Sequence, residues 1–295
     1  MIRNIEPGTY VVATSGGVDS MVLLDILRRQ PGVKIIVAHY DHGIRNDSGQ
    51  DRQLVQDVAA RHGLQFVYDQ GNLGSNTSED VARQARYAFL HRVRDASKAR
   101  AIITAHHQDD LLETAIHNML RGTGRRGLVS LRSREHIQRP LLHIPKADIT
   151  AYAKAQGLAW NEDSTNTDLR YRRNYIRHQI MPKFSINQKK ELLQHIRNIH
   201  RLHEELESQL INHLHLHPGK NQLNRHWFIM LPHGVAREVM ATWLRLHGIT
   251  EITSGIIERL IVASKTFVPG KQADIDKDHI LQIKKDILAL ERRVR

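Results

Sequence analysis

The run from Val11 to Ser20 joins an apolar segment to a short loop rich in glycine and hydroxyl side chains. Glycines let backbone N–H groups approach an anion closely, and the positive end of a following helix would point at that anion. The alternative is a strand–turn–helix joint without a ligand. The loop lacks the Gly-Lys-Ser/Thr of a Walker A motif. We predict a different phosphate-binding loop, made of Ser15, Gly16, Gly17, Val18, Asp19 and Ser20, with Asp19 placed to hold a cation that accompanies the phosphates.

A second polar group, from His106 to Glu113, contains three closely spaced carboxylates. Asp110 and Glu113 lie three residues apart, so they share a helical face. Carboxylates this close repel one another unless a cation lies between them, which predicts a Mg²⁺ site or a pocket for a cationic amine. The alternative is the ordinary enrichment of acids in the first turn of a helix. The predicted Mg²⁺ ligands are Asp19, Asp109 and Asp110.

Two further segments combine arginine with tyrosine. Arg83 and Arg86 share a helical face, and an arginine fork fits phosphate oxygens. The alternative is that either is a surface charge paired with Glu79. Between Arg172 and Arg177, arginine alternates with tyrosine and asparagine. That mixture is typical of contacts to RNA backbone and bases, and the alternative is a basic helix face.

These groups need a scaffold that brings them together. Strand and helix signals alternate over the first half of the chain, which predicts an α/β fold with a parallel sheet and helices on both faces. Ligands of such sheets bind beyond the carboxyl ends of the strands, where we expect the polar groups to meet. The predicted strands cover residues 10–14, 34–39, 65–69, 101–105 and 137–142. The predicted helices cover residues 21–29, 50–62, 78–98, 108–121 and 145–156.

The second half of the chain has a different composition. Residues 170–201 are rich in lysine and arginine and contain a single acid, Glu191. A helical pattern begins near Ile186 and ends at a break at Pro218. The remainder is predicted to be a smaller, mainly helical domain that ends in two strand-like segments, 280–283 and 287–290. The predicted organisation is a nucleotide-binding domain over residues 1–185, a helical linker over 186–217 and an RNA-binding domain over 218–295.

Composition narrows the function classes. The formal net charge of +12 predicts a polyanionic partner such as nucleic acid, with a solvated basic surface as the alternative. The chain has no cysteine, which excludes disulfides, thiolate–zinc sites and cysteine nucleophiles. It has no apolar run of about 18 residues and no signal-peptide pattern, so we expect no membrane span and a cytoplasmic location.

The phosphate loop resembles the pyrophosphatase loop of the N-type ATP pyrophosphatases, or PP-loop superfamily, which cleave ATP between its α and β phosphates. Within that superfamily, the order of motifs is similar to that of the tRNA(Ile)-lysidine synthase family. The similarity covers most of residues 10–185, whereas 186–295 match only loosely and resemble a short form without a further C-terminal domain. The matching segments are Ser15–Ser20, Asp41–Arg45, Ala82–Tyr87, His106–Glu113, Leu120–Leu128, Arg139–Leu142, Asp163–Asn166 and Arg173–Arg177.

The resemblance implies a reaction that uses ATP, Mg²⁺, L-lysine and a CAU-anticodon tRNA(Ile). The C2 oxygen of the wobble cytidine, position 34, becomes an adenylate, and the ε-amine of lysine then displaces AMP to give lysidine. The product reads AUA instead of AUG and carries isoleucine identity instead of methionine. The resemblance also allows a homodimer. The implied catalytic residues are Asp19, Arg86, Asp110, Glu113 and Arg173; His42 and His106 join the loop in nucleotide binding; and Arg125, Arg126, Arg172 and Arg177 contact RNA.

Two rival functions remain open. A tRNA thiolase built on the same loop is disfavoured, because such enzymes generally rely on catalytic cysteines or an iron–sulfur cluster. A non-catalytic nucleotide- or tRNA-binding module is the other rival. The retained acids Asp19, Asp109, Asp110 and Glu113 argue against it, because a binding module does not need them.

Overall fold

The computed structural model describes residues 2, 4–43, 48–71, 77, 79–134, 136–162, 172–213, 220–249 and 252–293. The chain forms two compact units, residues 1–200 and 201–295. Helix α8 (Ile186–His213) contributes residues to both units. None of the helices in the described ranges has the length and apolar character needed to cross a membrane.

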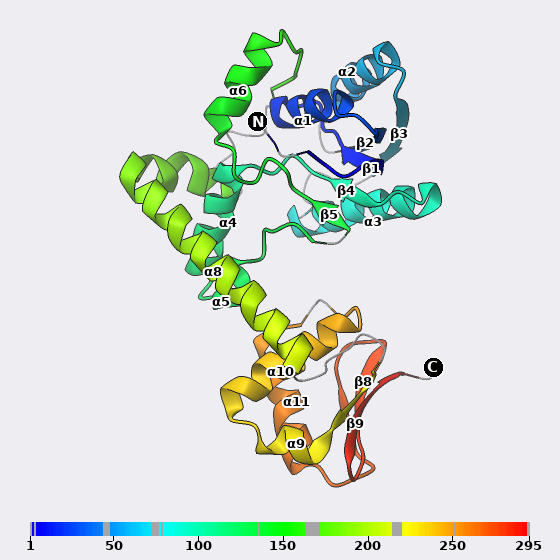
Figure 1. The fold of residues 1–295 in the computed structure, drawn as a ribbon, viewed down its shortest axis with the longest axis vertical. Helices are drawn as coiled ribbons and strands as arrows, with labels where there is room; N and C mark the ends of the chain where they lie inside the picture. The colour runs from blue at the N-terminus through cyan, green and yellow to red at the C-terminus, as the bar shows by residue number, and fades with distance from the viewer. Residues whose placement is uncertain are drawn as a thin grey trace. The chain divides into compact units, whose positions relative to one another are not determined.

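The first unit is built on a five-stranded parallel sheet with the strand order β3-β2-β1-β4-β5 (Figure 1). The central pair is fully buried, with Val11, Val12, Ile102 and Ile103 inaccessible to solvent. The chain runs outward from β1 to one edge and then returns to the other side at β4, so the topological switch lies between these two strands. The strands are β1 (Gly8–Ala13), β2 (Val33–Asp41), β3 (Gln65–Gln70), β4 (Ala101–Ile103) and β5 (Ile137–Gln138).

Helices cover both faces of this sheet, as the sequence predicts. Alternate residues of β1 point to opposite faces, so Val12 packs with α1, α2 and α6, whereas Val11 packs with α3. Each predicted helix of this half is confirmed within a few residues. The helices of this part are α1 (Val18–Arg28), α2 (Ser48–Arg61), α3 (Glu79–Ser97), α4 (Gln108–Leu120), α5 (Arg125–Leu128) and α6 (Lys146–Ala155).

A polar contact joins helices α1 and α6, which pack on the same face of the sheet. The hydroxyl of Tyr152 donates to the buried carboxylate of Asp25 at 2.9 Å. Arg28 and Arg29 also donate to Asp25, and after the opposing cost of burial these hydrogen bonds lower the pKa of its carboxyl. The contact fixes the register of α6 against α1, and with it the positions of the residues at their N-termini.

The fifth strand is shorter than predicted. It ends at Gln138, because the chain then turns, with Leu142 N donating to Arg139 O and Ile144 N to Leu141 O. After the turn, Leu141 and Leu142 are buried in the core instead of extending the sheet.

The second unit packs helices against a four-stranded antiparallel sheet with the order β6-β9-β8-β7. Asn224 caps α9 by accepting from Trp227 N, and Thr253 caps α11 by accepting from Ile256 N. Trp243 and Phe228 are fully buried in the core of this unit. The elements are β6 (Gln222–Asn224), α9 (Arg225–Met230), α10 (His233–Leu246), α11 (Ser254–Thr266), β7 (Gln272–Asp274), β8 (His279–Ile283) and β9 (Ile287–Arg292).

The two predicted C-terminal strands are confirmed as β8 and β9. β6 and β7 were not predicted, because three residues are too few for an alternating pattern to signal a strand. The expected break at Pro218 lies outside the described residues, so the predicted boundaries at 185 and 218 stay a prediction.

Candidate functional site

The loop between β1 and α1 turns sharply at Gly16. Its φ of +93° lies in the left-handed region, and a Cβ there would lie 3.3 Å from the Cβ of Asp51. Glycine is therefore required at this position. Asn161 N donates to Gly16 O at 3.0 Å, which ties the loop to a distant segment. The loop is a specifically built turn, as its composition predicts.

The hydroxyl of Ser20 organises this loop. Its Oγ accepts from the backbone N of Ser15 and of Gly16, both at 3.2 Å, and donates to Gly17 O at 2.8 Å. Ser20 is buried, whereas Ser15 is exposed and Gly17 half-buried. We conclude that Ser20 shapes the loop from beneath, and that Ser15 and Gly17 form the accessible side on which an anion would bind.

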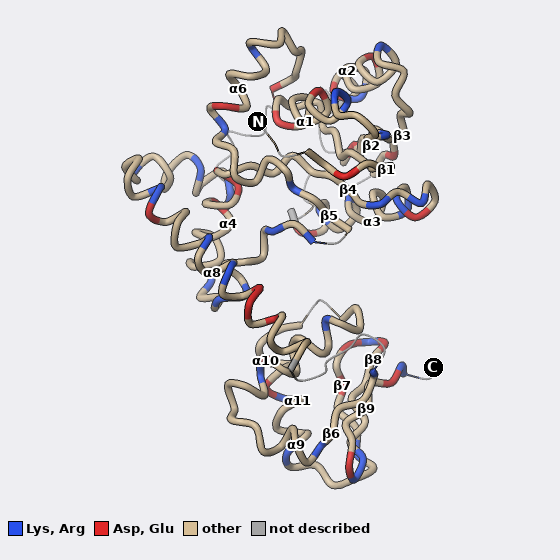
Figure 2. The backbone as a smooth tube through the Cα atoms, in the orientation of Figure 1, with Lys and Arg blue, Asp and Glu red and all other residues tan. Residues whose placement is uncertain are grey.

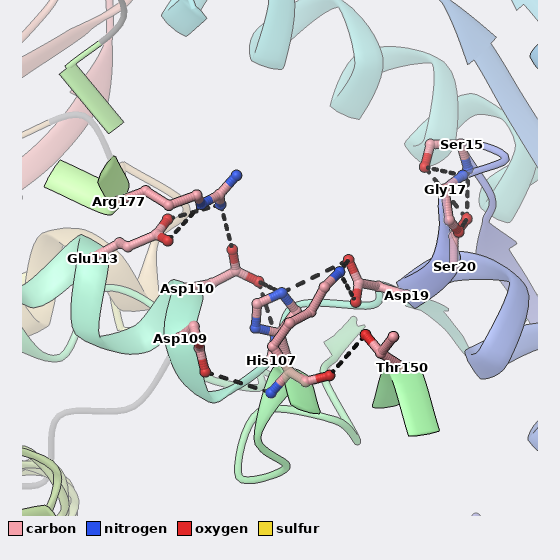
Figure 3. Close-up of polar contacts among 11 residues, drawn as sticks. Ser15, Gly17, Asp19, Ser20, His107, Asp109, Asp110, Glu113, Thr150 and Arg177 are labelled. Carbon is pink, nitrogen blue, oxygen red and sulfur yellow. Dashed lines mark hydrogen bonds and ion pairs between the residues drawn. The ribbon is translucent and has the colours of Figure 1, made fainter. Parts of the chain in front are cut away.

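Two of the predicted carboxylates, from different helices, face the same imidazole (Figure 3). His107 Nε2 lies 3.7 Å from Asp19 Oδ2 on α1 and 3.5 Å from Asp110 Oδ2 on α4. The backbone N of His107 also donates to Asp110 Oδ2 at 2.9 Å. The structure therefore places the phosphate loop and the acidic segment in one site, as the strand-end argument predicts.

Glu113 and Asp110 are linked through Arg177 (Figure 3). Arg177 Nε and Nη2 donate to the two carboxylate oxygens of Glu113 at 2.7 and 2.9 Å, and Nη2 lies 3.7 Å from Asp110 Oδ1. Burial raises the pKa of Glu113, and the hydrogen bonds from Arg177 limit that rise. Burial opposes the charge of Arg177, but the Glu113 carboxylate outweighs it and raises the pKa of the guanidinium.

This pairing differs from the role expected for Arg177. The sequence assigns it to RNA, but its guanidinium is engaged with Glu113 and Asp110 inside the acidic group. It lies on an irregular helical segment that continues α7 (Arg172–Tyr175) through residues 176–180. An RNA contact by Arg177 stays a prediction. In the structure its guanidinium links the carboxylates of Glu113 and Asp110 and so holds them in position.

Lys146 is a site residue that sequence reasoning missed. Its Nζ donates to both carboxylate oxygens of Asp19, at 2.6 and 2.7 Å, and its backbone N donates to Asp109 Oδ1 at 3.5 Å. It is the first residue of α6, in the connection that follows β5. The predicted site rests on polar residues just beyond the carboxyl ends of the strands. The same criterion after the fifth strand would have made Lys146 a candidate, although it would not have predicted the pairing with Asp19.

His106 lies at the end of β4 among arginines. Its Nδ1 is 2.8 Å from Thr104 Oγ1. Burial first, and then the charges of the surrounding arginines, hold the pKa of His106 well below its usual range, so the ring is neutral at neutral pH. The charges of Arg86 and Arg173, both expected to be catalytic, therefore both act on this side chain. The arginines around His106 are Arg83, Arg86, Arg139 and Arg173.

The remaining predicted residues take no part in the contacts described above, and lie as follows. His42 follows β2, and its ring packs edge-on against Tyr40 with centroids 5.0 Å apart. Arg125 and Arg126 are half-buried in α5, and Arg172 is exposed at the start of α7. Ile44, Arg45 and residues 163–171, which carry part of the motif pattern, lie outside the described residues.

The donor set of the acidic group fits Mg²⁺. Mg²⁺ prefers oxygen ligands and usually combines one or two carboxylates with waters and substrate phosphates. Asp19 and Asp110 offer such oxygens around a common neighbour, whereas Asp109 contacts the main chain of Lys146. Within the described ranges, no group of three or more His, Cys, Asp or Glu side chains is arranged to hold a metal ion by itself. The predicted ligand set stays a prediction.

Three helices begin at this edge of the sheet: α1 at Val18, α4 at Gln108 and α6 at Lys146 (Figure 1). The N-terminus of each helix carries a partial positive charge and free N–H groups. The site thus offers a positive field for an anion next to carboxylates that attract a cation. These are the charges that a metal-accompanied phosphate and an amine would each require.

Comparison with known proteins agrees with this geometry. Residues 1–184 match the family model described as the PP-loop domain. The tRNA(Ile)-lysidine synthase of Thermotoga sp. (strain RQ2) is 40% identical over 189 residues, covering 60% of this chain and 46% of that protein. The tRNA(Ile)-lysidine synthase of Thermus thermophilus is 43% identical over 190 residues, covering 62% of this chain and 37% of that protein.

The chain therefore spans less than half the length of these two relatives. Among solved structures, a U34-tRNA thiolase from Methanococcus maripaludis aligns with a TM-score of 0.47 at 16% identity, covering 70% of this chain and 73% of that one.

Proposed function

The chain belongs to the PP-loop family, and from that premise we propose that it is a ligase that joins L-lysine to the wobble cytidine of a CAU-anticodon tRNA(Ile). The single observation that carries the proposal is the approach of Asp19 and Asp110 to the same imidazole, His107. It supports a site in which a phosphate-binding loop and an amine-binding carboxylate act together. The sequence similarity to tRNA(Ile)-lysidine synthases supports the choice of substrates.

In this scheme ATP binds to the loop. The accessible N–H and hydroxyl groups of Ser15 and Gly17, with the positive end of α1, hold the β and γ phosphates. Asp19 would hold Mg²⁺, which neutralises phosphate charge when it is bound. Lys146 lies against Asp19 and supplies a further positive charge at the same place.

The first chemical step attaches AMP to the RNA. The C2 oxygen of the cytidine attacks the α phosphorus, the bond between the α and β phosphates breaks, and pyrophosphate leaves with the bonding electrons. Negative charge grows on the phosphoryl oxygens in the transition state, and prepositioned cations stabilise it. Arg86 and Arg173, which lie near the neutral His106, are the cations we assign to this task.

The second step transfers lysine. The ammonium of free lysine is a cation, and we assign its binding to Asp110, while Glu113 holds Arg177 in place. The amine must lose one proton before it attacks, and a carboxylate of this group accepts it. The nitrogen then bonds to C2 and the C2–O bond breaks, so that AMP leaves with the oxygen. The products are lysidine, AMP and pyrophosphate.

The basic second half is proposed to hold the tRNA. Lysine and arginine positions recur along α8 (Figure 2), and Lys190 and Arg197 are exposed there. Phosphate-dominated RNA binding weakens steeply with salt. We expect the affinity for the tRNA to fall accordingly, and a flat salt dependence would contradict this assignment.

A direct assay tests the proposal. The protein is mixed with ATP, Mg²⁺, labelled lysine and the CAU-anticodon tRNA(Ile). We expect label in the tRNA together with equal release of AMP, and none in a tRNA whose wobble cytidine is replaced by uridine. If the unaltered protein transfers no label to the cytidine-containing tRNA, the proposed function is wrong.

Variants then test the site. Asp110→Ala is expected to abolish transfer while tRNA affinity survives. Asp148→Ala is the matched control, because Asp148 is an exposed acid in the first turn of α6. An equal loss of transfer in both variants, or a collapse of RNA binding in Asp110→Ala, would contradict the assignment of Asp110.

A further inference from the structure

Arg139 is a buried arginine that pairs with no carboxylate among the described residues. Its side chain lies just after β5, and the residue is 7% exposed. Nη1 donates to Arg132 O and Nη2 to the Tyr87 hydroxyl at 3.4 Å, while Nε has no hydrogen-bond partner. Within the described part of the chain, no Asp or Glu forms an ion pair with it. Among the described residues, the groups that contact its guanidinium are neutral: the Arg132 carbonyl and the Tyr87 hydroxyl.

A second guanidinium approaches the same hydroxyl. Arg83 Nη2 lies 3.5 Å from the Tyr87 hydroxyl, and its guanidinium carbon lies 4.8 Å from the centre of the Tyr87 ring. Arg83 also forms no ion pair with a carboxylate of the described residues. Two cations thus converge on one phenol oxygen, Arg83 from α3 and Arg139 from the strand edge.

This convergence is costly without an anion. Burying an unpaired charge is unfavourable, and buried charges are ordinarily paired. Burial lowers the pKa of Arg139, the contact with Tyr87 opposes the fall, and the charges of Arg83 and Arg134 add to it. The charges of Arg139 and Arg83 also help to lower the pKa of His106, so that this ring adds no positive charge. An anion bound here would offset the repulsion.

We propose that Arg83 and Arg139, bridged by Tyr87, form a second phosphate-binding site, separate from the loop Ser15–Ser20. Two planar guanidinium forks fit a group that offers several oxygens, as a phosphate does. β4 pairs with β5, and Thr104 N donates to Gln138 O, so Arg139 lies beside the end of β4, where His106 begins the acidic segment. The site therefore lies beside the proposed catalytic group.

Two sources can supply the phosphate: an RNA phosphodiester or a phosphate of ATP. Naming these sources rests on the proposed function, but the site itself does not. The test therefore measures binding and leaves lysine transfer out, so a failure of the ligase assay does not decide it.

The experiment compares Arg83→Gln, Arg139→Gln and Tyr87→Phe with the unaltered protein. Affinity is measured for ATP alone and for an anticodon stem-loop RNA alone. Arg92→Gln is the matched control, because Arg92 lies on α3 but is exposed and pairs with Asp69 at 2.7 Å. We expect Arg83→Gln to weaken one of the two affinities about tenfold, as the loss of one charge-assisted contact would. If the source is RNA, the RNA affinity of Arg83→Gln should also depend less steeply on salt, with a slope smaller by the share of about one phosphate contact.

Loss of RNA affinity alone identifies a phosphodiester, and loss of ATP affinity alone identifies a nucleotide phosphate. Arg139→Gln removes an unpaired buried charge, so it is expected to keep the ligand-free fold at least as stable in urea unfolding. The proposal is overturned if Arg83→Gln leaves the affinities for both ATP and RNA unchanged. It is also overturned if Arg139→Gln destabilises the ligand-free protein while Arg83→Gln has the same ATP and RNA affinities as the control Arg92→Gln.

Discussion

Lys146 Nζ lies 2.6 and 2.7 Å from the two carboxylate oxygens of Asp19, a residue 127 positions earlier in the chain. Tyr152 and Asp25, also 127 positions apart, make a second contact between the same two helices. The equal separations show that α6 runs parallel to α1 in a fixed register. The contact between Asp25 and Tyr152 therefore helps to hold Lys146 beside Asp19 in the site.

Lys146→Met removes the cation beside Asp19. We expect the affinity for ATP to fall about tenfold, because a positive charge near the phosphates is lost, while the affinity for RNA stays unchanged. Isothermal titration with ATP measures the effect. Lys154→Met is the control, since Lys154 is exposed on the same helix. An unchanged ATP affinity in Lys146→Met would exclude Lys146 from the nucleotide site.

Gly16→Ala strains the loop. The left-handed φ costs a residue with a Cβ about 1–2 kcal/mol, and the new atom would contact Asp51. We expect a loss of that size in the free energy of unfolding and a weaker affinity for ATP. Gly49→Ala is the control: Gly49 lies in α2 with nothing within 4 Å of a Cβ, so alanine there should stabilise by up to about 1 kcal/mol. Equal effects at both glycines would contradict the role given to Gly16.

Glu113→Ala breaks the pair with Arg177. Glu113 is 2% exposed and accepts two hydrogen bonds, so we expect a loss of about 1.5–3 kcal/mol in the free energy of unfolding. Arg177 reaches solvent with about a third of its side chain, which keeps the loss at the lower end. Urea unfolding measures it, with the exposed Glu191→Ala as control. A double variant, Glu113→Ala with Arg177→Met, should lose less than the sum of the single losses. Additive losses would show that the pair contributes nothing.

His106 makes stability depend on pH. Its pKa in the folded protein lies well below 6.5, so as the pH falls the unfolded chain takes up the proton first. The contribution of His106 to folding stability is therefore fully present above about pH 7.5. It is lost as the pH falls through 6.5 toward the pKa of His106 in the folded protein. His106→Gln should reduce this loss by up to about 1.4 kcal/mol per pH unit in that window. The buried His39, whose pKa burial also lowers, leaves a remaining slope.

The measurement is urea unfolding at about pH 7.5 and about pH 5.5, on either side of the ordinary histidine pKa. His195→Gln, at an exposed position of α8, is the control and should keep the slope of the unaltered protein. A slope unchanged in His106→Gln would show that His106 is not held neutral.

The sequence predicts what depends on local pattern. The apolar run before Ser15 predicts β1 and its loop, and the spacing of Asp110 and Glu113 predicts their common face. It cannot predict contacts that depend on packing between distant elements. The Lys146–Asp19 pair needs the register of α6 on α1. Arg177 differs in no local feature from Arg172, yet the fold pairs one with Glu113 and leaves the other exposed.

The central claim is that one site first activates the wobble cytidine with ATP and then delivers lysine to it. The most direct measurement incubates the protein with CAU-anticodon tRNA(Ile), Mg²⁺ and ATP labelled at the α phosphate, at first without lysine. We expect label on the cytidine at position 34, and its release as AMP once lysine is added and enters the same nucleotide. If no label reaches the tRNA without lysine, and lysine enters without passing through a labelled adenylate, the account is contradicted.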